Sequence, residues 1–273
     1  MVAEKSMSRR DVVKGAGVLG CALALDAFVS GSSSGQENEP LRLRILSYNI
    51  QIGRGPGGSY SDPKQAFLER TAAVVRAANP DVAGLQEVDC KTNRSGAEVD
   101  QLKELAEMTS TTPTFVAKTE LPGGLYGIGV LSKEKPLATT CAYIKGSAHR
   151  RVLEICEFER YYFFNTHFPL KEDLRIAAVK IVNDEADKRG DKPIFFLGDL
   201  NAEPDSPEIQ EIKKTWTQLS PDGPTFPADA PKVQIDYIFV RNASKINVLD
   251  ARVIDDSTTS DHRPVFCEVE VCK

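Results

Sequence analysis

Apolar and polar residues recur along this chain with two different periods, and each period predicts its own element. Positions 41–47 begin as an alternation and then become continuously apolar, which is typical of a strand that enters a core. Positions 81–85 and 194–197 are short, unbroken apolar runs. Because such runs are too short for a helix, both predict strands that are buried on two faces.

Most of the remaining chain divides in the same way. Helical spacing of apolar residues predicts helices at 62–78, 98–108 and 174–189, and Ser206-Pro207 predicts the start of a short helix that reaches Lys214. The expected inward face of the 174–189 helix comprises Leu174, Ala177, Ala178, Ile181 and Val182. Further strands are predicted at 114–118, 127–132, 137–145, 152–159, 161–166, 234–240, 246–254 and 264–271.

This order of elements predicts an α/β fold in which helices are inserted after particular strands. Strands with two apolar faces need cover on both sides, whereas strands with one polar face do not. Two packed, mixed β-sheets with helices on their outer faces meet both demands. Nothing in the sequence repeats, so we expect a single domain over residues 36–273.

The first 35 residues predict an export signal and linker in front of that domain. Arg9-Arg10 precedes a small and apolar run at 15–29, and a Ser/Gly-rich stretch follows. This order is similar to a twin-arginine signal, and the glycines of the run make an ordinary N-terminal helix a weaker alternative. The sequence around Cys21 resembles a lipoprotein box, which offers a membrane tether. We therefore expect an exported protein, periplasmic or associated with the cell envelope.

Net charge and cysteine spacing indicate which binding partners, metals and disulfides the chain is suited to. The formal net charge is −5, which argues against binding duplex nucleic acid by counterion release, so we expect no stable nucleic-acid partner. We also expect a monomer. The six cysteines lack the spacing of a zinc site. Cys141 and Cys156 fall on neighbouring predicted strands and would form a disulfide in an oxidising compartment if they face each other.

Polar residues of a restricted kind stand at or near the predicted strand ends. Each type either binds a hard cation or moves protons, and ligands of open α/β sheets bind at such ends. Taken singly, a histidine here is also compatible with a hydrogen-bonded core position. The residues are Asn49, Glu87, His167, Asp199, Asn201, Asp236, Asp261 and His262.

Asp236 differs from the others because it lies inside an apolar strand. A buried carboxylate needs a partner. His262 is the expected one, since a carboxylate that fixes the tautomer of an imidazole is a recurrent arrangement.

Six segments carry a family resemblance. S-Y-N-I, L-Q-E-V-D, N-T-H-F, G-D-L-N, I-D-Y-I-F-V and S-D-H-R-P-V stand in the order and rough spacing of the endonuclease/exonuclease/phosphatase superfamily, which resembles deoxyribonuclease I. The similarity extends from about Leu41 to Val271. It implies a four-layer α/β/β/α sandwich whose site lies where the two sheets splay at one edge.

The resemblance also implies a role for each polar residue. Asn49 and Glu87 would bind Mg²⁺, with Mn²⁺ as a possible substitute, and Asp261 would be a nearby carboxylate. Asp199 would orient or deprotonate the attacking water, and Asn201 would hold a phosphate oxygen. His262, oriented by Asp236, would stabilise the developing charge or carry a proton, and His167 would contact the phosphate.

Two functions follow as expectations. The first is a Mg²⁺-dependent exported phosphoesterase that acts on a phosphodiester or phosphomonoester, with a lipid head group, nucleotide or sugar phosphate as substrate. The second is a non-catalytic cell-envelope binding domain on the same fold. Arg94 lies shortly after Glu87 and would reach a second phosphate or head group, or else be a solvated loop residue.

Overall fold

The computed structural model describes residues 39–55, 68–145 and 150–272. The chain divides into two compact units, Met1–Asn38 and Glu39–Lys273, and every described residue belongs to the second. The expected export signal, Cys21, the first part of the 62–78 helix and the turn near Gly146 lie outside the described residues. No described helix has the length and apolar character needed to cross a membrane.

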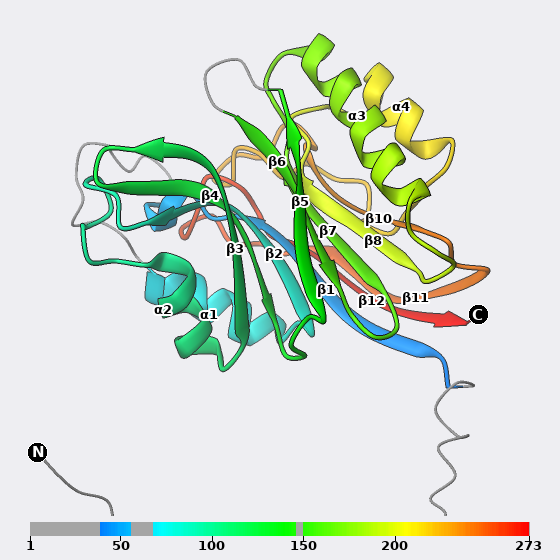
Figure 1. The fold of residues 1–273 in the computed structure, drawn as a ribbon, viewed down its shortest axis with the longest axis horizontal. Helices are drawn as coiled ribbons and strands as arrows, with labels where there is room; N and C mark the ends of the chain where they lie inside the picture. Colours follow the sequence, from blue (N-terminus) through cyan, green and yellow to red (C-terminus); the bar gives the residue numbers. More distant parts are fainter. Residues whose placement is uncertain (1–38, 56–67, 146–149, 273) are drawn as a thin grey trace, which may run out of the picture. The chain divides into compact units, whose positions relative to one another are not determined.

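The described residues form two six-stranded sheets, shown in Figure 1. The first has the order β11 (Lys245–Val253), β12 (Val265–Cys272), β1 (Leu41–Asn49), β2 (Val82–Cys90), β4 (Gly124–Ser132) and β3 (Thr112–Leu121). The second has the order β5 (Ala138–Ile144), β6 (Arg151–Glu157), β7 (Tyr162–His167), β8 (Ile194–Asp199), β10 (Asp236–Arg241) and β9 (Thr217–Gln218).

Each sheet is mixed and has one parallel pair. The pairs are β1 with β2 and β7 with β8, and a helix connects the strands of each pair. These helices are α1 (Leu68–Ala78) and α3 (Glu172–Asp187). Parallel neighbours require such a crossover, and it brings both strands of a pair to the same sheet edge.

The sheets pack face to face, with α1 and α2 (Gln101–Thr109) outside the first and α3 and α4 (Pro207–Lys213) outside the second (Figure 1). Alternate residues of one strand therefore enter different cores. Ile45, Phe195 and Leu197 belong to the core between the sheets, whereas Leu46 packs with α1 and α2 and Phe196 with α3 and α4. The expected α/β/β/α sandwich is confirmed.

Three features differ from the sequence-based expectations. The strand predicted at 81–85 continues to Cys90, because a bulge between Gln86 and Val88 lets the ladder with β4 resume. Ala177, expected on the inward face of α3, is exposed, whereas Val179 is buried. A short 3-10 helix, η1 (Gln51–Gly53), follows β1.

The disulfide between Cys141 and Cys156, which the sequence left open, is not formed. Both cysteines are free. The register of β5 against β6 places Glu154 opposite Cys141 and Thr139 opposite Cys156, so the two cysteines are not direct partners.

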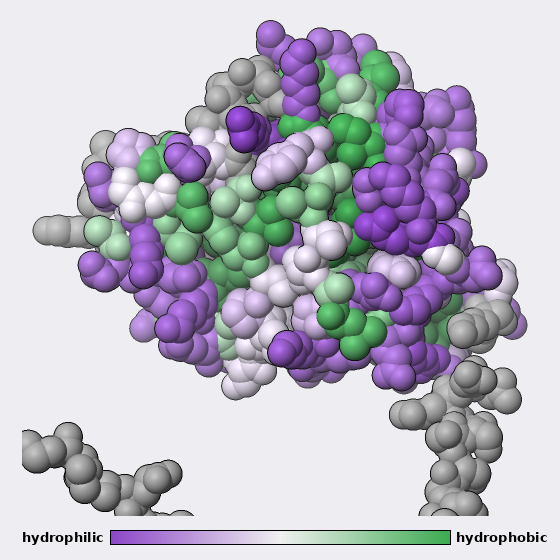
Figure 2. All heavy atoms as spheres, viewed as in Figure 1, coloured by the Kyte–Doolittle hydropathy of each residue, from purple (hydrophilic) through white to green (hydrophobic). Residues whose placement is uncertain are grey.

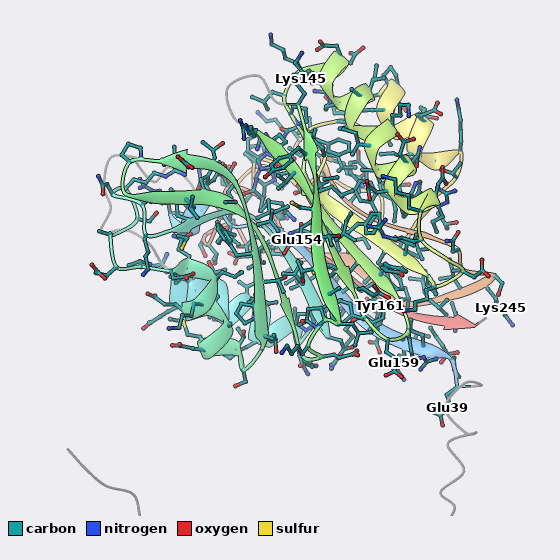
Figure 3. The ribbon with its side chains drawn as sticks, in the orientation of Figure 1. Glu39, Lys145, Glu154, Glu159, Tyr161 and Lys245 are labelled. Carbon is teal, nitrogen blue, oxygen red and sulfur yellow. The ribbon has the colours of Figure 1, made fainter. Side chains whose placement is uncertain are left out.

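Polar side chains also lie between the sheets, and we call Gln86, Thr114, Glu154 and Asn165 the inter-sheet polar cluster; Thr114 is half-buried and the other three are buried. Gln86 Nε2 donates to Asn165 Oδ1 at 2.8 Å, which joins β2 of one sheet to β7 of the other. Asn165 Nδ2 and Thr114 Oγ1 donate to the two carboxyl oxygens of Glu154 at 3.3 and 2.8 Å. Figure 3 labels Glu154 in the middle of the molecule. Burial raises the pKa of Glu154 to about 8, and the two hydrogen bonds oppose this shift.

Candidate active site

Three strands of the second sheet end in one row of polar side chains. His167 is paired with Asp199 across β7 and β8, and Asp199 is paired with Asp236 across β8 and β10. The row continues the inward face of each strand, as Asp199 follows Phe195 and Leu197 at alternate positions. All three side chains are buried.

Gly198 allows this row to form. Its φ of +145° is unfavourable for other residues, and a Cβ at this position would lie 2.0 Å from the carbonyl oxygen of Thr166. The absence of a side chain therefore lets β8 approach β7 closely just before Asp199.

His262 and Asp236 make the contact that the sequence predicts. His262 Nδ1 lies 2.9 Å from Asp236 Oδ2, and Thr225 Oγ1 donates to the same oxygen at 2.6 Å. The ring of Phe226 packs against the imidazole with a centroid distance of 4.9 Å. Because Nδ1 is engaged, Nε2 is directed toward Asp199, whose Oδ2 lies 3.8 Å away.

Asn49 reaches the same carboxylate from the first sheet. Its Nδ2 donates to Asp199 Oδ2 at 3.0 Å and lies 3.5 Å from His262 Nε2. Its Oδ1 accepts from the backbone of Gln51 in η1, and its carbonyl oxygen accepts from Ser260 Oγ. Both ends of the asparagine are therefore fixed.

His167 completes the surroundings of Asp199, with Nε2 at 3.4 Å from Oδ2. Asn201 contacts the other oxygen, since its backbone N donates to Asp199 Oδ1 at 3.0 Å, while its side-chain Nδ2 donates to the carbonyl of Phe168. Residues from both sheets thus converge on one carboxylate. The catalytic roles given to them stay predictions.

Burial and charge perturb both titrating groups at the centre. Burial raises the pKa of Asp199, and the imidazole of His262 opposes this effect. For His262, burial lowers the pKa, but the carboxylates of Asp236 and Asp199 raise it by more, so its pKa lies above the usual value. The imidazole therefore retains its proton at neutral pH beside a carboxylate of increased basicity.

Glu87 and Asp261 form a second acidic group at this edge. Glu87 occupies the β2 bulge with a φ of +57° and is half-buried. Burial raises the pKa of Asp261, His262 opposes this effect, and the negative charge of Glu87 raises the pKa further. The two carboxylates are thus close enough to repel each other.

This donor set fits a divalent cation. Hard cations such as Mg²⁺ prefer oxygen ligands and use one or two carboxylates, and a cation would remove the repulsion between Glu87 and Asp261. Ligand atoms of Asp199, Asp236 and His262 also lie within 4.8 Å of one another. However, Nδ1 of His262 is already bonded to Asp236 and the imidazole holds its proton, so the carboxylates of Glu87 and Asp261 suit a cation better.

Arg94 lies next to this acidic group but is held by another residue. Its Nε and Nη2 each approach a carboxylate oxygen of the buried Asp89 at 2.8 Å, and its guanidinium lies over the ring of Tyr126. Burial lowers the pKa of Arg94, but the carboxylate of Asp89 and, more weakly, that of Glu87 raise it by more, so this pKa lies above its usual value. The substrate-binding role of Arg94 stays a prediction.

Sequence reasoning did not select Thr225 or Ser260, although both position predicted residues. Thr225 is bonded to Asp236, and Ser260 bridges Asn49 and Asp261 with Oγ distances of 2.7 and 3.4 Å. Ser260 directly precedes Asp261, so its place in the S-D-H segment was a usable signal. Thr225 lies in a loop with no distinguishing pattern.

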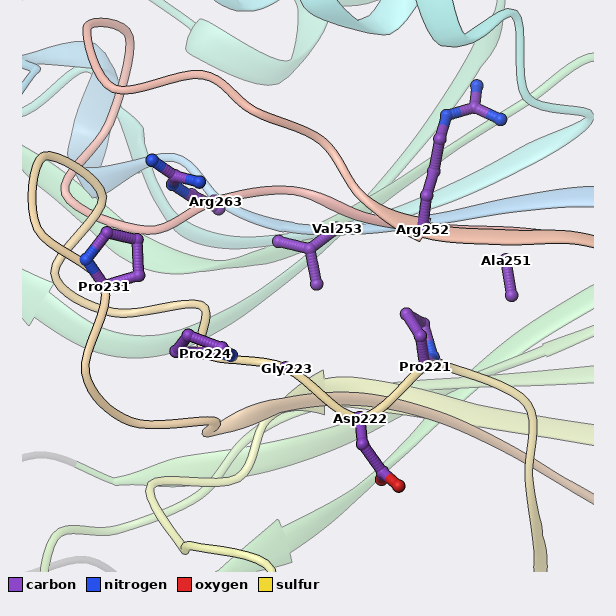
Figure 4. Close-up of a pocket in the computed structure, with 9 residues that line it drawn as sticks. All are labelled: Pro221, Asp222, Gly223, Pro224, Pro231, Ala251, Arg252, Val253 and Arg263. Atoms are coloured by element: carbon purple, nitrogen blue, oxygen red, sulfur yellow. The ribbon is translucent and has the colours of Figure 1, made fainter.

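A pocket of about 510 Å³ lies near the Asp199 site, between the 221–231 loop and β11. Pro221, Ala251 and Val253 are turned toward one another across it, whereas Asp222 and Arg252 point away (Figure 4). None of the predicted site residues lines the pocket. Two of its lining residues are sequence neighbours of residues at the Asp199 site: Pro224 precedes Thr225, and Arg263 follows His262.

Solved structures with the same fold come from several organisms. An endonuclease/exonuclease/phosphatase from Beutenbergia cavernae is 22% identical, with 85% of this chain and 72% of that chain covered and a TM-score of 0.68. A mannosyl-6-phosphatase from Bacteroides thetaiotaomicron is 19% identical, with 83% and 99% covered and a TM-score of 0.65. Truncated TDP2 from Caenorhabditis elegans is 17% identical, with 85% and 98% covered and a TM-score of 0.60.

No curated protein sequence matches this chain significantly. The family model described as the endonuclease/exonuclease/phosphatase family matches residues 46–262, which include every predicted site residue. With this match and the shared fold, the chain belongs to the endonuclease/exonuclease/phosphatase family.

Proposed function

We propose that this protein is an exported, Mg²⁺-dependent phosphoesterase that hydrolyses a phosphodiester or phosphomonoester by attack of water. Members of its family are phosphoesterases, nucleases and phosphatases, usually dependent on a divalent metal. The observation that carries the proposal is a convergence of side chains on Asp199. Asn49 of β1 and His262, just before β12, reach it from the first sheet, and His167 of β7 reaches it from the second.

Asp199 is the proposed general base. Its raised pKa suits it to accept a proton near neutral pH. It accepts the proton of the attacking water as the bond from the water oxygen to phosphorus forms. Asn49 and the backbone of Asn201 hold its two oxygens in place, so the carboxylate does not need to reorient.

His262 is the proposed acid. Asp236 holds the imidazole through Nδ1 and keeps it protonated, so Nε2 can donate its proton to the leaving-group oxygen as the bond to phosphorus breaks. The positive charge of the imidazolium also stabilises the negative charge that develops on the phosphoryl oxygens. His167 is suited to contact one of those oxygens.

Glu87 and Asp261, with Asn49 beside them, are the residues that would hold Mg²⁺. A bound divalent cation supplies Lewis-acid stabilisation of a phosphoryl oxygen without needing a proton. Mn²⁺ would serve as a substitute because it has the same preference for oxygen ligands.

Substrates fall into three proposed groups, namely lipid head groups, nucleotides and sugar phosphates. The structural similarity to a mannosyl-6-phosphatase favours testing sugar phosphates first. The net charge of −5 continues to argue against a nucleic-acid duplex as a stable partner.

The direct test is turnover of bis-p-nitrophenyl phosphate, p-nitrophenyl phosphate and mannose 6-phosphate by the purified full chain with Mg²⁺. We expect hydrolysis of at least one ester, loss of activity with a chelator and recovery when Mg²⁺ or Mn²⁺ is restored. Asp199→Ala and His262→Ala should each abolish turnover. Asp229→Asn, an exposed carboxylate in the loop that carries Thr225, should retain it.

If no ester is cleaved although the wild-type chain is folded and binds Mg²⁺ by calorimetry, the proposal fails. The same fold would then serve as a non-catalytic binding domain of the cell envelope, which is the second function that the sequence allows. Turnover that survives both the chelator and Asp199→Ala would contradict the mechanism.

Export rests on the sequence of the first 35 residues alone, with Arg9-Arg10 and the box around Cys21 as the support. Fractionation of a bacterial host that expresses the full chain should place the protein in the periplasm or envelope. Replacement of both arginines by lysine should retain it in the cytoplasm. Incorporation of labelled fatty acid that Cys21→Ala abolishes would identify a lipoprotein.

A further inference from the structure

The four edge strands of the two described sheets are protected unequally. β9 has only two residues, which gives little backbone to pair with. β11 carries Lys245, Asp250 and Arg252 and has a bulge between Val248 and Asp250. β3 carries Pro113 and Glu120 and has a bulge between Ala117 and Thr119. Short length, charge, proline and bulges are the usual means by which proteins prevent edge pairing.

β5 has none of these protections. Its seven residues, Ala-Thr-Thr-Cys-Ala-Tyr-Ile, include no charge and no proline, and their pairing with β6 is regular throughout. The first four residues and Tyr143 are exposed, and Tyr143 retains 66% of its accessible surface. Threonine, tyrosine and isoleucine also favour strands, so the edge is open and well suited to pairing.

The surface around this edge is correspondingly poor in charge. In the view of Figure 2, the area over β3, β4 and β5 is pale to green, whereas strongly hydrophilic residues surround it. A partner strand would therefore approach β5 without displacing charged side chains.

We propose that β5 pairs antiparallel with β5 of a second copy of this chain, so that two six-stranded sheets join into one across a two-fold axis. Successive backbone groups of a strand point to opposite edges, so a residue whose groups point outward must meet another of that kind. A two-fold antiparallel pair is therefore centred on a residue and not between two residues. Centring on Cys141, the middle of the seven, pairs every residue of both strands.

This register is chemically self-complementary. Cys141 lies opposite itself, Thr139 opposite Tyr143, Thr140 opposite Ala142 and Ala138 opposite Ile144. Aromatic and β-branched residues are favourable cross-strand partners. Lys145, the first charged residue after β5, lies opposite Leu137 and not opposite a second lysine. A copy of the same chain thus satisfies the edge without a mismatch of charge.

The expected dimer is weak and reversible. A pair of seven-residue strands buries less surface than a standard interface of about 1,600 Å², so the dissociation constant should lie in the range of roughly 1–100 μM. This proposal replaces the expectation of a monomer. It is independent of the catalytic proposal, because no residue of β5 belongs to the site.

Sedimentation equilibrium of the purified full chain under reducing conditions, from about 1 to 200 μM, tests the proposal. We expect a reversible monomer–dimer equilibrium. Cys141→Lys places two like charges opposite each other at the axis and should weaken the dimer roughly tenfold or more. Tyr143→Asp is a second disrupting variant that acts at two symmetric positions, for use if Cys141→Lys does not fold. Cys141→Ser should leave the dimer intact.

The matched control is Asn247→Lys, which adds the same charge to an exposed position of β11, and it should not change the equilibrium. Mild oxidation at about pH 9, chosen because partial burial and the nearby Glu154 raise the pKa of the Cys141 thiol, should trap a disulfide-linked dimer that Cys141→Ser abolishes. A chain that stays monomeric up to 200 μM overturns the proposal. A dimer that both Cys141→Lys and Tyr143→Asp leave unchanged also overturns it.

Discussion

The inter-sheet polar cluster and the Asp199 site are both buried, yet they use burial differently. The inter-sheet cluster contains one ionisable group, Glu154, and burial raises its pKa to about 8, so it is uncharged at neutral pH. The Asp199 site brings several carboxylates together with imidazoles. The imidazole of His262 lies within 4 Å of the carboxylates of both Asp199 and Asp236, so groups of opposite charge face each other there. Neutral hydrogen bonds join the sheets, whereas the site at the strand ends keeps charged groups, as a catalytic site would.

Replacing Asp199 with asparagine should separate the two regions most sharply. Asparagine keeps the shape and one acceptor oxygen but does not accept the water proton, so kcat should fall on the order of 10³-fold. The free energy of unfolding should change by less than about 1 kcal/mol, because a buried charge is removed along with the hydrogen bonds it accepts. Steady-state kinetics and urea unfolding measure the two effects.

Retained activity in Asp199→Asn would remove the general base from the mechanism. A large loss of stability with little loss of kcat would mean that the Asp199 site is structural, as the inter-sheet cluster is.

Glu154→Gln tests the inter-sheet polar cluster through the pH dependence of the free energy of unfolding. The carboxyl group has a pKa near 4.5 when unfolded and about 8 when folded, so the folded chain binds more protons between these values. Wild-type stability should therefore fall as pH rises through this window, by on the order of 3 kcal/mol for this group. Glutamine mimics the neutral acid and should remove that part of the slope.

Urea unfolding at pH 5 and pH 8.5 gives the slope for each protein. Glu159→Gln, which replaces an exposed carboxylate close by in sequence, should keep the wild-type slope. An unchanged slope in Glu154→Gln would show that Glu154 does not titrate in this window.

Asn165→Leu should cost stability, while Asp199→Asn should cost activity. Leucine fills a similar volume but removes the hydrogen bonds of the Asn165 amide with Gln86 Nε2 and with the carbonyl of Gly129, and Gln86 Nε2 keeps only the carbonyl of Gly84 as acceptor. We expect a loss of about 2 kcal/mol in the free energy of unfolding, measured in urea. A loss below about 0.5 kcal/mol would show that other groups or water replace the amide.

Of the four substitutions predicted in this comparison, Thr225→Val should have the smallest effect, and it should reduce activity and not stability. The hydroxyl donates to Asp236 Oδ2, so its loss leaves His262 less well oriented without removing it. A decrease in kcat of about tenfold is expected, with little change in KM. Thr225→Ser should restore activity, and failure of that rescue would mean that the methyl group matters rather than the hydrogen bond.

Sequence patterns located the strands better than they located the backbone detail at their ends. The buried run before Asp199 and the need of the Asp236 carboxylate for a partner were both readable, because apolar continuity and an uncompensated charge leave a clear signal. Asp236 itself begins β10, whereas the predicted strand 234–240 placed it inside the strand. The bulge at Glu87 was not, since a left-handed φ at a residue other than glycine has no sequence signature of its own.

Side-chain partnerships formed by loops were the least predictable. In the sequence Arg94 looks like a cation that is available to bind substrate. In the structure the loop folds back, and Arg94 forms a bidentate ion pair with Asp89. Thr225 was missed for the same reason, because its contact with Asp236 depends on how the 221–231 loop returns to β10. Local sequence does not encode such returns.

The in-register row of His167, Asp199 and Asp236 constrains how this protein can diverge. One residue inserted into β8 before Asp199 would invert the facing of every later position of that strand and turn the carboxylate of Asp199 toward α3 and α4. Strand lengths here should therefore stay fixed in descendants of this gene. New substrate preferences would then have to arise from insertions and deletions in connecting segments, such as the one between β9 and β10.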